Sequence, residues 1–216
     1  MSDSLATLTT KLQALLMDDG TLFTATSCTA AIRQALQEIN LRLPRHMGTT
    51  IAAVTSQYEY ELTTALAGAV PLLIMDVLLQ DPSGGEYDRS LSFHSYNEDE
   101  RHWIRLDLPQ TTGQYLIVRY TLPHTILNLD SATESTLPAA YDPILLDGAA
   151  AIACDIAIAG KAEAYYLNPQ TAANYKTAAG HFRAAFTYGL KAMLQVRRPQ
   201  KSAPDLRTWE DEWHGW

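Results

Sequence analysis

Apolar residues recur at helical spacing at the start of the chain. The first such stretch predicts a short amphipathic helix, capped by Ser2 or Ser4 and stopped at Asp18-Asp19-Gly20. Its inward residues are Leu5, Leu8, Leu12, Leu15 and Leu16. A second helix is predicted from Thr26-Ser27 to just before Pro44, because the residue before a proline is pushed out of helical dihedrals. Its inward residues are Ala31, Ile32, Ala35, Leu36 and Ile39.

From about Val70 the pattern changes to short apolar runs separated by turn residues, which predicts antiparallel strands. The first run ends at a strong turn, 81–85, and the next alternates at period two over 91–96. After a polar turn the apolar pattern resumes at 103–106, and 115–122 is the most strand-like run because it is rich in aromatic and β-branched residues. Residues 70–122 are therefore expected to form a small sheet of about four strands.

The pattern returns to helical after a loop, 124–138, that is rich in Thr, Ser and Asp. An alanine-rich helix is predicted from about Tyr141 through Ala157. The last long helix begins after Asn168-Pro169, with proline at an N-terminal helical position, and ends near Arg198-Pro199. Its apolar stripe comprises Ala172, Tyr175, Ala179, Phe182, Phe186, Leu190 and Met193.

Together these elements predict an α+β fold: a bundle of about four helices, an inserted small antiparallel β-sheet and an extended C-terminal arm. The expected divisions are N-terminal helices at 1–69, the inserted β module at 70–122, the loop and C-terminal helices at 123–198, and the arm at 199–216. At 216 residues the chain is long enough for one body with an insertion.

The net charge of −8, from 16 basic and 24 acidic residues, argues against a surface that grips nucleic acid by neutralising phosphates. Nothing near Met1 reads as a secretory signal, and the apolar runs 67–79 and 148–160 are too short for a membrane span, so we expect a soluble, cytoplasmic protein without membrane contact. Cys28 and Cys154 lie in apolar surroundings and are expected to be reduced, buried thiols.

No spacing typical of catalysis or metal binding occurs. There is no phosphate-binding glycine loop and no Gly-x-Ser-x-Gly elbow, and no two of the six histidines stand at helical metal-ligand spacing. One polar loop could in principle hold a hard cation through His124, Asn128, Asp130 and Glu134, although such loops commonly use these side chains to satisfy their own backbone. We expect a protein that is not an enzyme and has no cofactor, metal or catalytic residue.

The C-terminal arm is the most distinctive feature of the sequence. Three of the four tryptophans fall in the last eight residues, and tryptophan is favoured as an interface anchor. The arm is basic first and acidic afterwards, which would fix the register of a complementary partner. We predict that it binds a partner through Arg197, Arg198, Lys201, Arg207, Trp209, Trp213 and Trp216. The alternative is that the arm folds back onto its own body.

The layout resembles the head-to-tail adaptor (connector) proteins of tailed bacteriophages. The resemblance is carried by the N-terminal helix pair, the inserted sheet, the segment His124-Thr-Ile-Leu-Asn-Leu-Asp130 with Thr136-Leu-Pro138, and an alanine-rich helix beginning near Leu146-Asp-Gly-Ala-Ala150. A long final helix with an extended arm completes it. The sheet is an extra module relative to the smallest adaptors.

The resemblance implies a homo-oligomeric ring, usually of twelve copies, seated beneath the portal protein in the virion, after a stage in the host cytoplasm. It implies that the arm docks on the portal, that a downstream neck or tail protein binds below, and that DNA is only transiting cargo. Two alternatives stay open: another tail, neck or baseplate component, and a small-molecule or metal-binding protein that uses the loop near His124.

Overall fold

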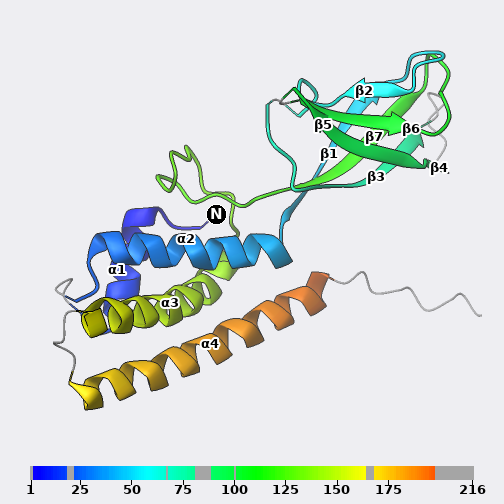
Figure 1. Ribbon diagram of the computed structural model, residues 1–216. Helices are drawn as coiled ribbons and strands as arrows, with labels where there is room; N and C mark the ends of the chain where they lie inside the picture. Colours follow the sequence, from blue (N-terminus) through cyan, green and yellow to red (C-terminus); the bar gives the residue numbers. More distant parts are fainter. Residues whose placement is uncertain are drawn as a thin grey trace, which may run out of the picture.

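The computed structural model describes residues 2–18, 22–66, 68–80, 89–99, 101–163 and 168–197, without the side chains of 161–163 and 197. Figure 1 shows two parts: a body of four helices, and a β module at one end of it. The chain leaves the body after the second helix and returns to it before the third, so the module is an insertion. The predicted α+β class is confirmed.

The first two helices begin at side-chain caps. Helix α1 spans Leu5–Leu15, and the Ser4 hydroxyl accepts a hydrogen bond from the backbone N–H of Thr7. Helix α2 spans Ala25–Arg42, and the Thr24 hydroxyl accepts from the N–H of Ser27. Each cap satisfies a helix N-terminal N–H that has no partner within the helix. The predicted cap at Ser4 is confirmed.

Helix α3 (Asp142–Glu163) is the centre of the body. It follows a 3₁₀ turn at Ala139–Tyr141 and packs against both α2 and α4 (Pro169–Arg197), which barely touch each other. Glycines allow the close approach of α3 and α4: a Cβ added at Gly148 would lie 2.8 Å from the Phe186 ring, and one at Gly189 would lie 2.8 Å from Ile144. The predicted alanine-rich packing helix is therefore α3.

By length and composition alone, one helical stretch among the described residues, Ala139–Gly160, could cross a membrane. It is longer than the apolar run 148–160 noted in the sequence, because Ile144 and Leu145 lie on the same continuous helix. The core helix of a soluble protein passes the same test, and α3 packs between α2 and α4. Its apolar residues therefore have a structural explanation within the body.

The β module consists of two antiparallel sheets with a core of their own. In the first sheet the order is β1 (Arg45–Ala52), β7 (Tyr115–Leu122), β3 (Leu73–Gln80), β4 (Arg89–Ser90). In the second it is β2 (Glu59–Glu61), β6 (Arg101–Leu106), β5 (Phe93–Glu98). The separate core includes Tyr60, Leu62, Val77, Ile104, Leu106, Leu116, Val118 and Tyr120.

The predicted start of the module was wrong. Strands begin at Arg45, not at residue 70, and there are two sheets where one was expected. β1 pairs with β7 along its whole length, yet its strand signal in the sequence is weak because its more exposed positions include Ala52 and Gly48, and glycine has no side chain. The pairing with the strongly strand-like β7 fixes β1 as a strand, and the helical segment before the module ends with α2.

We predict that Gly148→Ala destabilises the body relative to Gly180→Ala. Both glycines lie inside helices, so both substitutions gain the same helix propensity, but a Cβ at Gly180 meets nothing within 4 Å. The added methyl at position 148 meets the buried Phe186 ring and should cost about 1–3 kcal/mol of unfolding free energy more than the control. Urea unfolding followed by helical circular dichroism measures this difference, and equal stabilities would show that the contact relaxes freely.

Candidate functional site

Neither thiol is placed for nucleophilic chemistry. Cys28 and Cys154 are both free and fully buried in the helical core. Burial raises the pKa of the Cys28 thiol above its ordinary value, and it raises the pKa of Cys154 to about 11, with the neighbouring Asp155 carboxylate adding to the shift. Reactive cysteines show the opposite shift. Both side chains therefore serve as small apolar core residues.

The 124–138 loop does not gather its polar side chains into a cation site. Asp130 is engaged by Arg33 of α2 in a two-pronged ion pair, with Nη2 to Oδ1 at 2.6 Å and Nε to Oδ2 at 3.0 Å. His124 is buried and packs edge-on against Tyr141, with ring centroids 6.2 Å apart. Within the part of the chain that the structure describes, no group of His, Cys, Asp or Glu residues could hold a metal ion.

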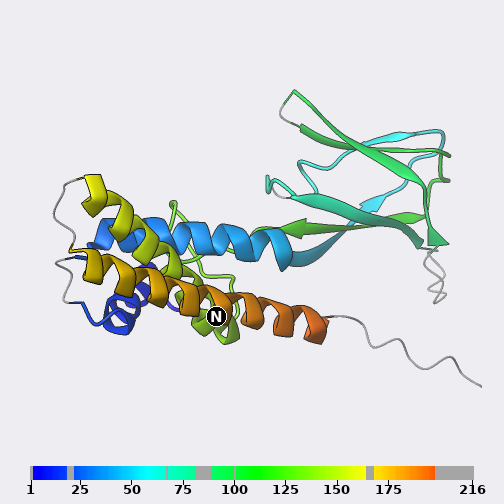
Figure 2. The same cartoon turned by 60° about the horizontal axis from the view of Figure 1, so that its bottom comes forward.

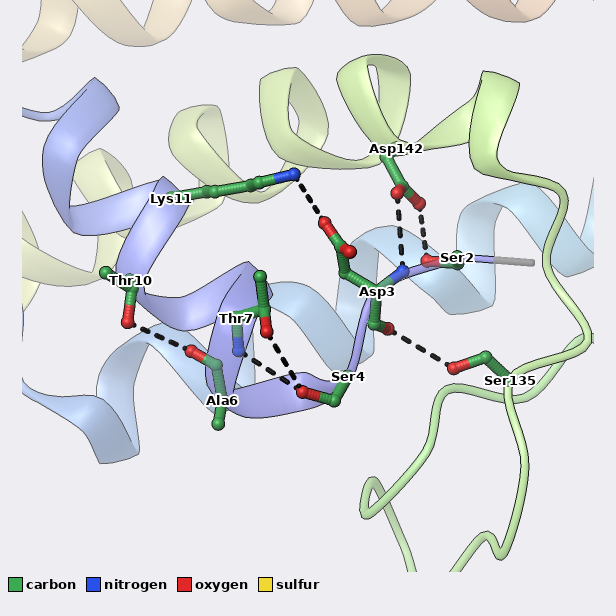
Figure 3. A network of polar contacts seen from close by, with 9 residues as sticks. All are labelled: Ser2, Asp3, Ser4, Ala6, Thr7, Thr10, Lys11, Ser135 and Asp142. Atoms are coloured by element: carbon green, nitrogen blue, oxygen red, sulfur yellow. Dashed lines mark hydrogen bonds and ion pairs between the residues drawn. The ribbon is translucent and has the colours of Figure 1, made fainter.

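A polar clasp ties the N-terminal segment to the start of α3, as Figure 3 shows. The Ser2 hydroxyl donates to one oxygen of the Asp142 carboxylate, and the Asp3 backbone N–H lies 3.4 Å from the other. Asp3 in turn forms an ion pair with Lys11, and its carbonyl accepts from the Ser135 hydroxyl at 3.2 Å. The clasp joins α1, α3 and the 124–138 loop.

The β module joins the body through two adjacent chain segments. The first leaves α2 at Leu43-Pro44, and the second returns at Pro123, directly after β7. The side chain of Asn40 in α2 bridges them: its Oδ1 accepts from the N–H of His124 at 2.7 Å, and its Nδ2 donates to the His124 carbonyl at 3.1 Å. The Asn40 amide thus continues the hydrogen-bonding pattern of the β1–β7 pair beyond the end of the two strands. It fixes the point at which the module leaves the body.

The predicted docking arm starts where α4 ends. Arg197 is the last residue of α4, and α4 runs toward the end of the body that carries the module (Figures 1 and 2). The other predicted docking residues, Arg198, Lys201, Arg207, Trp209, Trp213 and Trp216, lie outside the described residues. Their role stays a prediction.

A comparison with protein families now identifies the layout. The sequence profile described as "SU10 adaptor protein" matches residues 3–208, nearly the whole chain. The chain belongs to the SU10 adaptor family. The predicted identity as a head-to-tail adaptor, a structural component of a bacteriophage virion, is thereby confirmed.

Solved structures give only weak likenesses to this adaptor. A chain from the neck of an empty gene transfer agent particle is 16% identical, with 65% of this chain and 74% of that chain covered and a TM-score of 0.31. A chain of the native gene transfer agent virion is 15% identical over 58% and 64%, with a TM-score of 0.30. TM-scores this low support no conclusion about this chain. Among curated proteins, no match to this chain is found.

The outer face of the adaptor's second sheet carries two ion pairs and one histidine–carboxylate contact. Glu59 lies 3.9 Å from Arg105, Glu61 lies 3.5 Å from Arg101, and His94 lies 3.6 Å from Asp107. Tyr58, Tyr96 and Trp103 stand among these pairs, around two open hollows. Burial and the Glu59 carboxylate raise the pKa of Tyr96. Of the three aromatic side chains Tyr58 is exposed and the other two are half-buried. Aromatic and arginine side chains at a surface are enriched in protein interfaces.

The adaptor's first sheet has an open, apolar edge. β4 pairs with β3 only at Leu78 and Leu79, so the first half of β3 has no strand on that side among the described residues. The side chains on and just before this half-strand are exposed: Val70, Leu72, Leu73 and Met75. Soluble proteins usually cover or charge such edges. Neither surface of the module can be recognised in the sequence, because a single strand does not reveal which residues become its neighbours.

We predict that both thiols stay unreactive in the folded adaptor. With a pKa of about 11, Cys154 is roughly one part in a thousand thiolate at pH 8, and the fraction rises only as the pH approaches 11. A chromogenic disulfide reagent at pH 8 should therefore react at least about 100-fold more slowly than with free cysteine. Full reactivity should return in denaturant, and fast labelling of the folded Cys28→Ala variant would contradict the burial of Cys154.

We also predict that Asn40→Ala loosens the junction between body and module. The substitution removes two hydrogen bonds to a partly buried backbone and should cost about 1–3 kcal/mol. Gln37→Ala, an exposed position on the same helix, is the control and should change stability by less than about 0.5 kcal/mol. Thermal unfolding measures the cost, and small-angle scattering reports whether the mean separation of the two parts spreads. An unchanged melting temperature would show that the junction does not depend on Asn40.

Proposed function

We propose that this adaptor forms a ring of twelve copies beneath the portal protein and connects it to the neck and tail, with DNA passing through the channel. The observation that carries the proposal is the family match over residues 3–208, which includes the body, the module and the part of the arm that precedes the tryptophans, 199–208. The net charge of −8 suits a channel that must not hold DNA. Assembly takes place from subunits in the host cytoplasm, and the final location is the head–tail interface of the virion.

The C-terminal arm is the portal-binding element in this proposal. Its tryptophans, Trp209, Trp213 and Trp216, are the apolar anchors, because burying an indole contributes more to binding than burying most other side chains. Arg197, Arg198, Lys201 and Arg207 supply charge that fixes the register on the portal. The arm follows a rigid helix of 29 residues, so α4 aims it from a defined point on the body.

The β module is the element that contacts the next neck or tail protein or the neighbouring subunit. Its open β3 edge offers backbone hydrogen-bonding groups beside apolar side chains, and the outer face of its second sheet offers aromatic and arginine side chains. Because the module has a core of its own, it can present these surfaces without disturbing the helical body.

Removing the arm tests the proposed portal contact. A variant ending at Pro199 should lose at least about 100-fold in affinity for purified portal rings, and Trp213→Ala alone should lose roughly 30-fold, the effect of about 2 kcal/mol at an anchor residue. Tyr58→Ala, which removes an exposed aromatic ring from the module, is the matched control and should bind the portal normally. Surface plasmon resonance measures the affinities. Undiminished portal binding by the shortened variant would refute the role of the arm.

A further inference from the structure

The outer face of α4 is uncovered. The helix packs on α3 through a stripe that includes Ala179, Phe186 and Leu190, all buried. Tyr188 lies on the opposite side of the helix, since two residues correspond to about 200° of rotation from either Phe186 or Leu190. Its side chain is 77% exposed, and Val196 near the helix end is 82% exposed. A large aromatic ring this accessible on a regular helix is a candidate contact residue.

The charge of α4 is opposite to that of the rest of the chain. The helix carries Lys176, Arg183, Lys191 and Arg197 and no acidic residue, which leaves 12 basic against 24 acidic residues elsewhere. Arg183 forms an ion pair with Asp155 of α3. Lys191 forms no ion pair within the described residues, and it follows Tyr188 by three positions, so the two lie on adjoining parts of one helix face.

The outer face of α2 carries the complementary pair. Leu41 is 82% exposed, and Glu38, three positions before it, is exposed and has no ion pair among the described residues. In Figure 1, α2 and α4 lie on opposite sides of α3 and run in the same direction. Leu41 and Tyr188 both fall in the half of their helix that is nearer to the β module. The two faces thus lie at a similar position along the length of the body, on opposite sides of it.

We propose that Tyr188 and Lys191 of one copy pack on Leu41 and Glu38 of the next copy in the ring. A ring requires two different, complementary surfaces on opposite sides of each subunit, and these two faces meet that requirement. The contact covers an exposed ring and an exposed leucine with each other and pairs a lysine with a glutamate. The inference rests on the proposed function, because it names the subunit contact within the proposed ring.

This arrangement assigns different surfaces to different partners. The α4 and α2 faces serve contacts between copies, whereas the open β3 edge and the second sheet of the module stay available to other proteins. A second copy is the favoured occupant of the α4 face because Lys191 on this face has no ion pair within the described residues, and Glu38 on the opposite side of every copy has none either. A portal or neck protein on the same face would be the competing occupant, and the experiment separates the two.

Cysteine cross-linking tests the contact. The double variant Tyr188→Cys, Leu41→Cys, assembled on portal rings and treated with a short bis-maleimide, should give a ladder of adaptor multimers on a denaturing gel. Neither single variant should give more than monomer, since equivalent residues do not meet in a head-to-tail contact. The native thiols are buried and do not contribute. The pair Tyr188→Cys, Leu108→Cys, with its second cysteine at an exposed apolar site of the module, is the matched control and should not form a ladder.

A charge exchange provides a second measurement. Lys191→Glu should weaken ring assembly at least about tenfold by placing like charges together, and adding Glu38→Lys in the same chain should restore it. Assembly is followed by analytical ultracentrifugation of the adaptor with portal rings.

The outcomes distinguish the proposed contact between copies from the proposed ring on the portal. Self-linking of the Tyr188→Cys single variant would indicate a two-fold contact and overturn the inference, as would linking of that residue to the portal. Rings that assemble without a ladder from the double variant would overturn the inference and leave the proposed function standing. Wild-type adaptor that forms no ring on the portal under any condition would overturn both.

Discussion

The close approach of α3 to its neighbours is the constraint on which the helical body depends. α3 is in contact with α2 on one side and α4 on another, so it cannot carry bulky side chains all the way round. Alanines and a glycine occupy its buried positions between 148 and 153, and there the larger group comes from the opposing helix, as with the Phe186 ring over Gly148. At the start of α3 the roles are reversed, because the buried Ile144 side chain lies over Gly189 of α4. Interiors packed at this density tolerate little added volume. The position of α4, and with it the start of the arm, therefore follows from residues in α3.

The protein has two separate hydrophobic cores, one in the helical body and one in the β module. The helical core and the module core share no buried residue, and the chain passes between them only at 43–45 and 122–124. The Asn40 amide replaces a missing strand at that point by pairing with both backbone groups of His124. A module with its own core, joined to the body at one junction, keeps its surfaces separate from the packing of the helices.

The exposed apolar residues make sense as surfaces of an assembly subunit. Leu41, Leu73 and Tyr188 are each well over half exposed, and they belong to three different faces. A monomer gains nothing from them, whereas subunits in a virion gain contact area wherever such a face is covered. The buried carboxylate Asp142 shows the contrasting case: its hydrogen bonds with Ser2 and Asp3 are satisfied within the chain, so it stabilises the fold without inviting a partner.

The sequence by itself determined the four helices and the most regular strand. Periodic leucines, the Ser4 cap, Pro169 at the start of α4 and the aromatic and β-branched content of β7 are local signals, and they act within one or two turns or one strand. The docking arm stays a prediction from the sequence: three tryptophans in eight residues need no fold to be recognised, and they lie outside the described residues.

Only the tertiary structure decided the rest. β1 is a strand because it pairs with β7, which lies some 70 residues later in the chain. The Asn40 side chain forms hydrogen bonds with His124, which is 84 residues away in the sequence. Likewise, Glu38 with Leu41 and Tyr188 with Lys191 are unremarkable in sequence, and their placement on opposite sides of one body arises from how α3 separates their helices. Local propensity fixes backbone conformation residue by residue, whereas a surface is made by residues that meet only after the chain has folded.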